Sequence, residues 1–129
     1  MGGGDPQQFR EMAEQLHTAW REHGRAGRPR TAALAYFSLE PSARRQAERY
    51  LGRYYDFPPD AGDRALIEAA GATTLAQAII RGTAQDPEAV FKLVAAWQAV
   101  DCDELMLLPC GTEPDQVDLL ADALAACLS

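Results

Sequence analysis

The sequence predicts an α/β fold with about two parallel strands and five or six helices. Two continuous apolar runs, residues 31–39 and 104–108, lack the alternation of a half-exposed strand. Such runs are typical of parallel strands that are covered on both faces. Most of the remaining chain places apolar residues at helical spacing. The segment between the two runs is long enough for the helical, right-handed crossover that parallel strands require.

The first helix is predicted to begin at Asp5 and Pro6. An aspartate caps free backbone amides, and proline suits the first helical position because no N–H is needed there. The apolar face that follows has members three or four positions apart, namely Phe9, Met12, Leu16, Trp20 and His23. Two glycines and Pro29 end this helix, and Pro29 and Pro41 favour a strand over a helix for residues 31–39.

The crossover is predicted to consist of helices. The first spans roughly residues 40–57, with an apolar face made of Ala43, Ala47, Tyr50, Leu51 and Tyr54. Residues 63–82 predict two short helices that are split at 71–74, and another helix starts at Asp86 and Pro87. The inward face of that helix is predicted to hold Val90, Leu93, Val94 and Trp97.

The last helix is predicted to open at Glu113 and Pro114, directly after the second strand. Asp115 lies near its positive end, where a carboxylate is favoured. Its apolar stripe is Val117, Leu120, Ala121, Leu124 and Leu128.

Two parallel strands do not form a stable sheet in water, because both would carry an unpaired backbone edge. A (β/α)8 barrel needs about 250 residues, whereas this chain has 129. The chain also starts with a helix, without the strand that should precede it. We therefore expect residues 1–129 to form a single incomplete domain, the C-terminal sector of a larger α/β domain.

Composition and net charge indicate which kinds of binding partner are not expected. Apolar residues make up 47% of the chain, which is enough for a core, and the net charge of −7 does not favour a nucleic acid or an anionic membrane. The charge is uneven, since residues 1–57 carry nine arginines and seven acids, whereas residues 58–129 carry three basic and twelve acidic residues. No apolar run is long enough to span a bilayer and no signal peptide is recognised, so we expect a cytoplasmic protein.

The order and spacing of several segments resemble the C-terminal portion of the luciferase-like flavin- or deazaflavin-dependent oxidoreductases. The segments are "RTAALAYFSL", "ARRQAERYLGRYYDF" and "AQDPEAVFKLVAAWQAVDCDELMLLPCGTEPDQVDLLADAL". Residues 86–90 match the family's "G-x-P-E-x-V" segment, residues 101–108 its next strand, and residues 113–120 its "DPEQ-x-x-LL" helix. "GGGDPQQF" resembles the loop and helix that follow the family's sixth strand.

The resemblance implies a partial (β/α)8 TIM barrel that binds FMN or coenzyme F-420 at the C-terminal ends of its strands. The implied function is that of an oxidoreductase or monooxygenase acting on a small molecule. The region that would match the first six strands, which supplies most family contacts to the cofactor, is missing from this chain. The resemblance thus implies a fragment that is inactive by itself. The alternative is a non-catalytic truncated product or an assembly subunit that completes its sheet by self-association or with another chain.

Two groups of residues are candidates for ligand contacts. Gly2, Gly3 and Gly4 precede a helix N-terminus, where free amides attract anions, so they could cradle a cofactor phosphate; a flexible chain start is the competing interpretation. The second group lies at the C-terminal ends of the two strands, where barrels carry their chemistry. This second group consists of Tyr36, Ser38, Cys110 and Thr112. These residues could line a pocket for a cofactor ring or a substrate, or they could simply pack the lumen and form turns.

No residue is predicted to act as a catalytic acid, base or nucleophile. A buried cysteine such as Cys110 usually behaves as a small hydrophobe, and no partner histidine can be assigned to it. His17 and His23 are six positions apart, which is not the spacing of a helical metal pair. The three cysteines lack CxxC spacing, so neither a zinc site nor a disulfide framework is expected. The arginines at 44, 45, 49 and 53 are predicted to form a solvated helix face.

Overall fold

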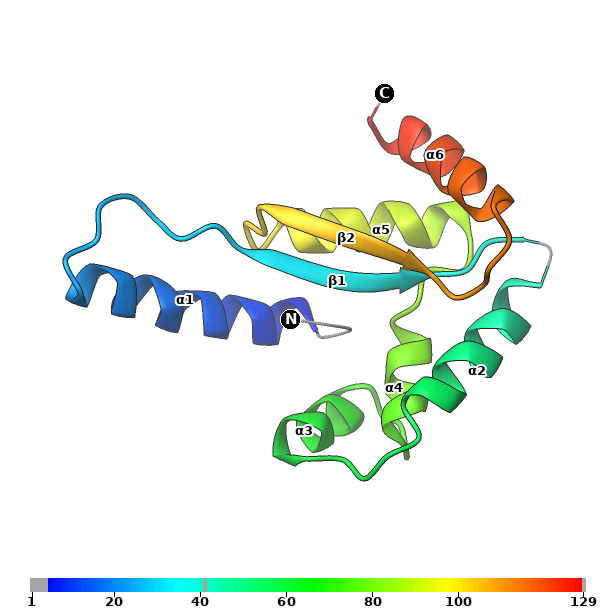
Figure 1. Ribbon diagram of the computed structural model, residues 1–129, viewed down its shortest axis with the longest axis horizontal. Helices are drawn as coiled ribbons and strands as arrows, with labels where there is room; N and C mark the ends of the chain where they lie inside the picture. The colour runs from blue at the N-terminus through cyan, green and yellow to red at the C-terminus, as the bar shows by residue number, and fades with distance from the viewer. Residues whose placement is uncertain (1–4, 41, 129) are drawn as a thin grey trace.

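The computed structural model describes residues 5–40 and 42–128, and shows an α/β arrangement of six helices and two parallel strands over those residues (Figure 1). The predicted order of elements is confirmed. In chain order they are α1 (Pro6–Glu22), β1 (Ala32–Phe37), α2 (Ala43–Tyr54), α3 (Ala61–Ala69), α4 (Leu75–Arg81), α5 (Pro87–Gln98), β2 (Glu104–Pro109) and α6 (Asp115–Leu128).

The sheet consists of β1 and β2, which pair in parallel with Ala32 opposite Glu104 and Phe37 opposite Pro109. β1 is shorter than the apolar run that predicted it, because the chain leaves the ladder after Phe37. The amide of Ser38 donates to the carbonyl of Ala84 at 2.8 Å, and the Ala84 amide donates to the Tyr36 carbonyl at 3.1 Å. This single bridge covers only the C-terminal end of the β1 edge that faces away from β2.

Odd-numbered residues of both strands face α1, α5 and α6. Phe37 and Leu107 pack with residues of α5 and α6, and Ala33 packs with the rings of Phe9 and Trp97. Those two rings meet edge to face, with centroids 5.3 Å apart. Burial of these apolar side chains is the main stabilising term for this side of the sheet.

The opposite face of the sheet is covered only over β1. Tyr36 is buried there against α2 and α4. The neighbouring side chains of β2 are open, with Met106 44% and Leu108 38% exposed. The expectation that the second strand is covered on both faces is therefore wrong for the described chain, because none of its described elements covers this face of β2.

Other predicted apolar faces are also partly open. On α1, Phe9 is buried but Met12 and Leu16 are exposed. On α2, Leu51 is fully buried while Tyr54 is 62% exposed. Helical periodicity identifies the apolar face of a helix, but it does not show whether another part of the chain packs against that face.

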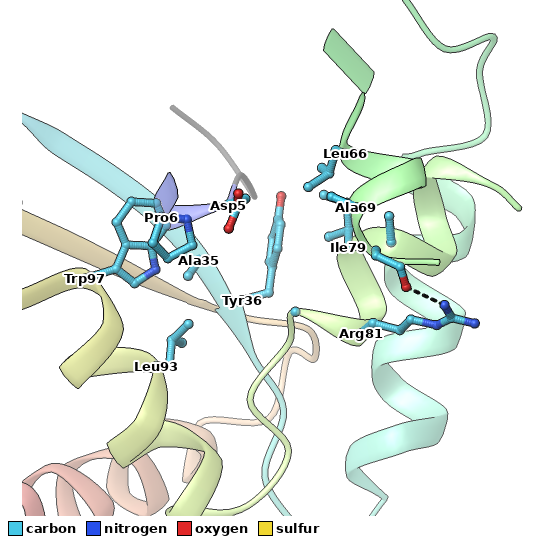
Figure 2. Close-up of a pocket in the computed structure, with 13 residues that line it drawn as sticks. Asp5, Pro6, Ala35, Tyr36, Leu66, Ala69, Ile79, Arg81, Leu93 and Trp97 are labelled. Carbon is cyan, nitrogen blue, oxygen red and sulfur yellow. Dashed lines mark hydrogen bonds between the residues drawn. The ribbon is translucent and has the colours of Figure 1, made fainter. Parts of the chain in front are cut away.

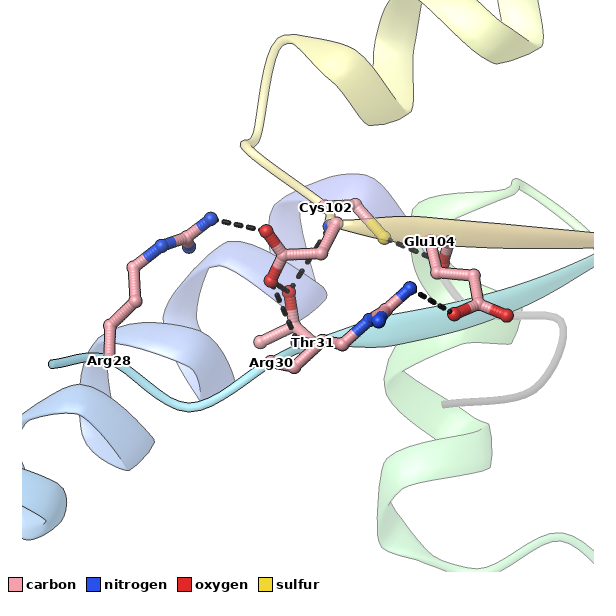
Figure 3. Close-up of polar contacts among 6 residues, drawn as sticks. Arg28, Arg30, Thr31, Cys102 and Glu104 are labelled. Atoms are coloured by element: carbon pink, nitrogen blue, oxygen red, sulfur yellow. Dashed lines mark hydrogen bonds and ion pairs between the residues drawn. The ribbon is translucent and has the colours of Figure 1, made fainter.

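The N-terminal ends of the two strands are joined by polar contacts (Figure 3). One carboxylate oxygen of Asp103 accepts from the Thr31 amide at 2.8 Å and from its hydroxyl at 3.0 Å, and the other pairs with Arg28. Arg30 pairs with Glu104 at 2.9 Å. These contacts hold the register at the end of the sheet opposite to the candidate pocket.

Local signals set most helix starts. Asp86 caps α5 by accepting from the Ala89 amide at 2.7 Å, and Asp60 with Asp63 forms a capping box on α3. Asp5 occupies the predicted capping position of α1, but its side chain makes no capping hydrogen bond. No described helix has the length and apolar character needed to cross a membrane.

Candidate ligand pocket at the C-terminal ends of the strands

A cavity of about 510 Å³ lies between α2 and the loop that follows β2. The loop contributes residues 110–113, which come directly after the C-terminal end of β2. Helix α2 contributes an amide, two guanidinium groups and two phenol rings, from Gln46, Arg49, Arg53, Tyr50 and Tyr54. Polar and aromatic groups thus meet at the edge of the sheet where parallel folds place their ligands.

The structure brings together the second group of sequence-predicted site residues, although not all in the same role. Cys110 and Thr112 line the cavity. Ser38 is fully buried, and its hydroxyl donates to Gln46 Oε1 at 3.4 Å, so it contacts the wall rather than the cavity. Tyr36 packs in the same core cluster as Cys110 beneath the cavity. The other candidates, Gly2, Gly3 and Gly4, lie outside the described residues.

Aromatic side chains form a continuous group on this side of the molecule. The hydroxyl groups of Tyr36 and Tyr55 share a hydrogen bond of 2.9 Å. Tyr54 meets Tyr55 edge to face at 5.0 Å, and its ring is parallel to that of Tyr50, with centroids 6.3 Å apart. Burial raises the pKa of both Tyr36 and Tyr55, so the pair stays protonated at neutral pH.

Cys110 does not have the properties of a nucleophile. Burial raises the pKa of its thiol to about 12, and the thiolate is the reactive form. The cysteine therefore contributes an apolar floor to the cavity, as expected from its place after a buried strand.

The arginines on α2 differ from one another in their surroundings. Arg44 pairs with Glu48 at 2.9 Å in the usual i, i+4 arrangement. Arg49 and Arg53 make no ion pair or hydrogen bond with any residue that the structure describes, and both line the cavity. The four arginines are exposed, as predicted for a solvated helix face, but the sequence did not predict that two of them border a cavity. The signal was the i, i+4 pair of arginines beside an i, i+4 pair of tyrosines.

A second cavity, of about 300 Å³, runs along the free edge of β1 (Figure 2). Ala35, Tyr36, Ile79 and Trp97 line it together with the N-terminus of α1. Arg81 closes one side by donating from Nη1 to the Ala70 carbonyl at 2.6 Å. This cavity is mostly apolar and lies along the β1 edge on which Leu34 has no strand partner among the described residues.

Metal-binding clusters are not found among the described histidine, cysteine, aspartate and glutamate residues. His23 Nδ1 lies 2.8 Å from the Ala19 carbonyl oxygen, a local contact within its own helix end. In comparisons with known proteins, no family, no curated protein and no solved structure matches the chain.

Proposed function

We propose that this chain supplies the last two strands of a luciferase-like (β/α)8 barrel that uses FMN or coenzyme F-420 as an oxidoreductase. The observation that supports this is a two-stranded parallel sheet, within the described residues, whose outer edges lack strand partners apart from the bridge to Ala84 and whose β2 is open on one face. A sheet of this kind is completed by further strands. By itself the chain would lack most contacts to the cofactor.

Strand geometry identifies the backbone N–H and C=O groups that could pair with a further strand. The backbone N–H and C=O groups of successive residues point alternately to the two edges of a strand. The Tyr36 carbonyl accepts a hydrogen bond from the Ala84 amide, which shows that Tyr36 points to the edge away from β2. The N–H and C=O of Leu34 point to the same edge, and no described backbone group pairs with them. On the outer edge of β2 the same alternation exposes the backbone groups of Leu105 and Leu107.

The uncovered side chains lie where neighbouring strands and a packed lumen would be. Met106 and Leu108 occupy the open face of β2. In a closed barrel, inward-facing residues from neighbouring strands fill the interior in layers. Completion of the sheet would bury both side chains and stabilise the assembly by about 25 cal/mol for each Å² of apolar area removed from water.

The described residues fit one wall of a flavin site rather than a whole site. Tyr50 and Tyr54 offer aromatic rings, and Thr112 offers a hydroxyl. The guanidinium groups of Arg49 and Arg53, which have no partner among the described residues, offer charge for a phosphate. When bound, FMN or F-420 would supply the hydride or electron transfer. The role of this chain would be to orient one side of the ligand and exclude water from it.

A non-catalytic assembly subunit is the second candidate, favoured by the same open face and by the exposed Met12 and Leu16 on α1. The two candidates differ in what lies upstream of the first codon. A reading frame that continues with strand–helix repeats supports the barrel enzyme, whereas an unrelated or interrupted frame supports the subunit.

Light scattering over a range of chain concentrations, combined with titration by FMN and F-420, tests the proposal. We expect association that grows with concentration and no micromolar flavin binding by the chain alone. Met106→Lys with Leu108→Lys should reduce association, whereas the control Val117→Lys, at an exposed apolar residue of α6, should not. A monomer that binds flavin with micromolar affinity would overturn the fragment interpretation, and a monomer that binds none would overturn sheet completion.

A further inference from the structure

Positive charge is concentrated on α2 in an otherwise acidic protein. The helix carries four arginines and one glutamate, while the whole chain has a net charge of −7. From this and from the lining of the 510 Å³ cavity, we infer that the pocket between α2 and the β2–α6 loop binds a small planar aromatic molecule bearing a phosphate or carboxylate group.

Two of the four arginines are free to bind an anion. Arg44 is already occupied by Glu48, and Arg45 does not line the cavity. Arg49 and Arg53 are one helical turn apart on the cavity wall, without an acceptor among the described residues. Guanidinium groups bind phosphate and carboxylate through paired, charge-assisted hydrogen bonds, which are stronger than neutral ones.

The loop opposite these arginines adds donors. The amides of Gly111 and Thr112 donate no hydrogen bond within the described chain, and Thr112 also carries a hydroxyl. Gly111 allows the loop to lie close to α2, because a Cβ there would come within 2.8 Å of Gln46 Oε1. The two guanidinium groups and the two loop residues therefore line the same cavity.

The aromatic part of the ligand is inferred from the tyrosine pair. The parallel rings of Tyr50 and Tyr54 line the same cavity and remain 45% and 62% exposed. Planar rings pack favourably on such surfaces, in offset-stacked or edge-to-face geometry. Guanidinium groups and exposed rings in the lining of one cavity favour an aromatic anion over a simple salt ion.

Glu113 also lines the cavity and opposes an anion. Two guanidinium groups against one carboxylate leave one net positive charge. This balance predicts modest affinity in the native chain and a gain when the carboxylate is neutralised. These residues are the ones that form one wall of the flavin site in the proposed function, but binding of a small aromatic anion requires no residue of another chain.

Titration of the full chain with phenyl phosphate, benzoate, inorganic phosphate and phenol, followed by amide chemical shifts, tests the inference. We expect phenyl phosphate or benzoate to shift the amides of α2 and of residues 110–113, and inorganic phosphate and phenol to bind at least about tenfold more weakly. A preference between phenyl phosphate and benzoate would identify the anionic group.

Variants at exposed positions make the test specific. Arg49→Gln and Arg53→Gln should each weaken phenyl phosphate binding about tenfold, and Glu113→Gln should strengthen it. Arg45→Gln, a matched control on the same helix, should leave affinity unchanged. The inference fails if neither aromatic anion shifts these amides, if Arg45→Gln weakens binding as much as the pocket variants, or if Glu113→Gln weakens it. Phenol binding as tightly as the anions would also overturn it.

Discussion

Replacement of Gln116 by leucine would remove the side chain that attaches α6 to the end of β1. Gln116 is 1% exposed, and its amide acts as a substitute strand partner for Leu39. Its Oε1 accepts from the Leu39 amide at 2.9 Å, and its Nε2 donates to the carbonyls of Leu39 at 2.7 Å and Glu40 at 3.2 Å. Leucine has a similar volume but can make none of these three contacts.

The expected cost follows from the backbone groups that are left unpaired. Leu39 is buried, so its N–H and C=O would lose their partners without gaining water. Each buried orphan costs about 1–3 kcal/mol, so the free energy of unfolding should fall by about 2–6 kcal/mol. Because a domain is stable by only about 5–15 kcal/mol, this is a large fraction of the total.

Urea unfolding monitored by the fluorescence of buried Trp97 measures this change. With a slope of about 2 kcal/mol/M, the midpoint should fall by about 1–3 M. Gln98→Leu, at an exposed position of α5, is the matched control and should change stability by less than about 0.5 kcal/mol. The reasoning is refuted if Gln116→Leu shifts the midpoint no more than this control.

Three further predictions concern the core, the strand register and the candidate pocket. Trp97→Ala, which leaves a cavity beside Phe9, should lower the free energy of unfolding by about 3–5 kcal/mol. If urea unfolding showed a decrease of less than about 1 kcal/mol, the packing of the Trp97 ring against Phe9 would be contradicted. The pKa of Asp103 lies below its ordinary value of 3.8, chiefly because a backbone amide donates to the carboxylate. The carboxylate therefore stabilises the fold above pH 3.8, and this stabilisation is lost as pH falls through the folded pKa. The free energy of unfolding should thus depend less on pH in Asp103→Asn over that window. Identical pH dependence in the two proteins would refute the stabilising role of Asp103. Iodoacetamide should label the half-buried Cys102 well before Cys110, because burial raises the pKa of the Cys110 thiol to about 12. Equal labelling rates of the two cysteines in peptide mass mapping would contradict the burial of Cys110.

The element order was accessible from sequence because it depends on local signals. Asp86 followed by Pro87 starts α5, and Thr74 after a glycine-containing break starts α4. Continuous apolar runs predicted the strands, and the long helical segment between them predicted their parallel pairing. These preferences act within a few residues of chain and need no knowledge of distant contacts.

The pocket was only half accessible from sequence. The rule that ligands gather at the C-terminal ends of parallel strands predicted the region of Cys110 and Thr112. It did not predict that α2 would lie across that region, so the place of Arg49, Arg53 and Tyr54 beside the cavity was not predicted. Which helix covers which end of a sheet depends on the path of the crossover, and amphipathic periodicity gives no information about that path.

By itself, then, the chain's pattern of apolar, capping and breaking residues determined the α/β class, the two parallel strands and the positions of the helices. The tertiary structure alone decided that one face of β2 stays open, that Gln116 replaces a strand partner for Leu39, and that guanidinium groups and tyrosine rings face a common cavity. The physical reason is that propensity and periodicity act along a single segment. Burial and the pairing of polar groups depend on segments that meet only when the chain is folded.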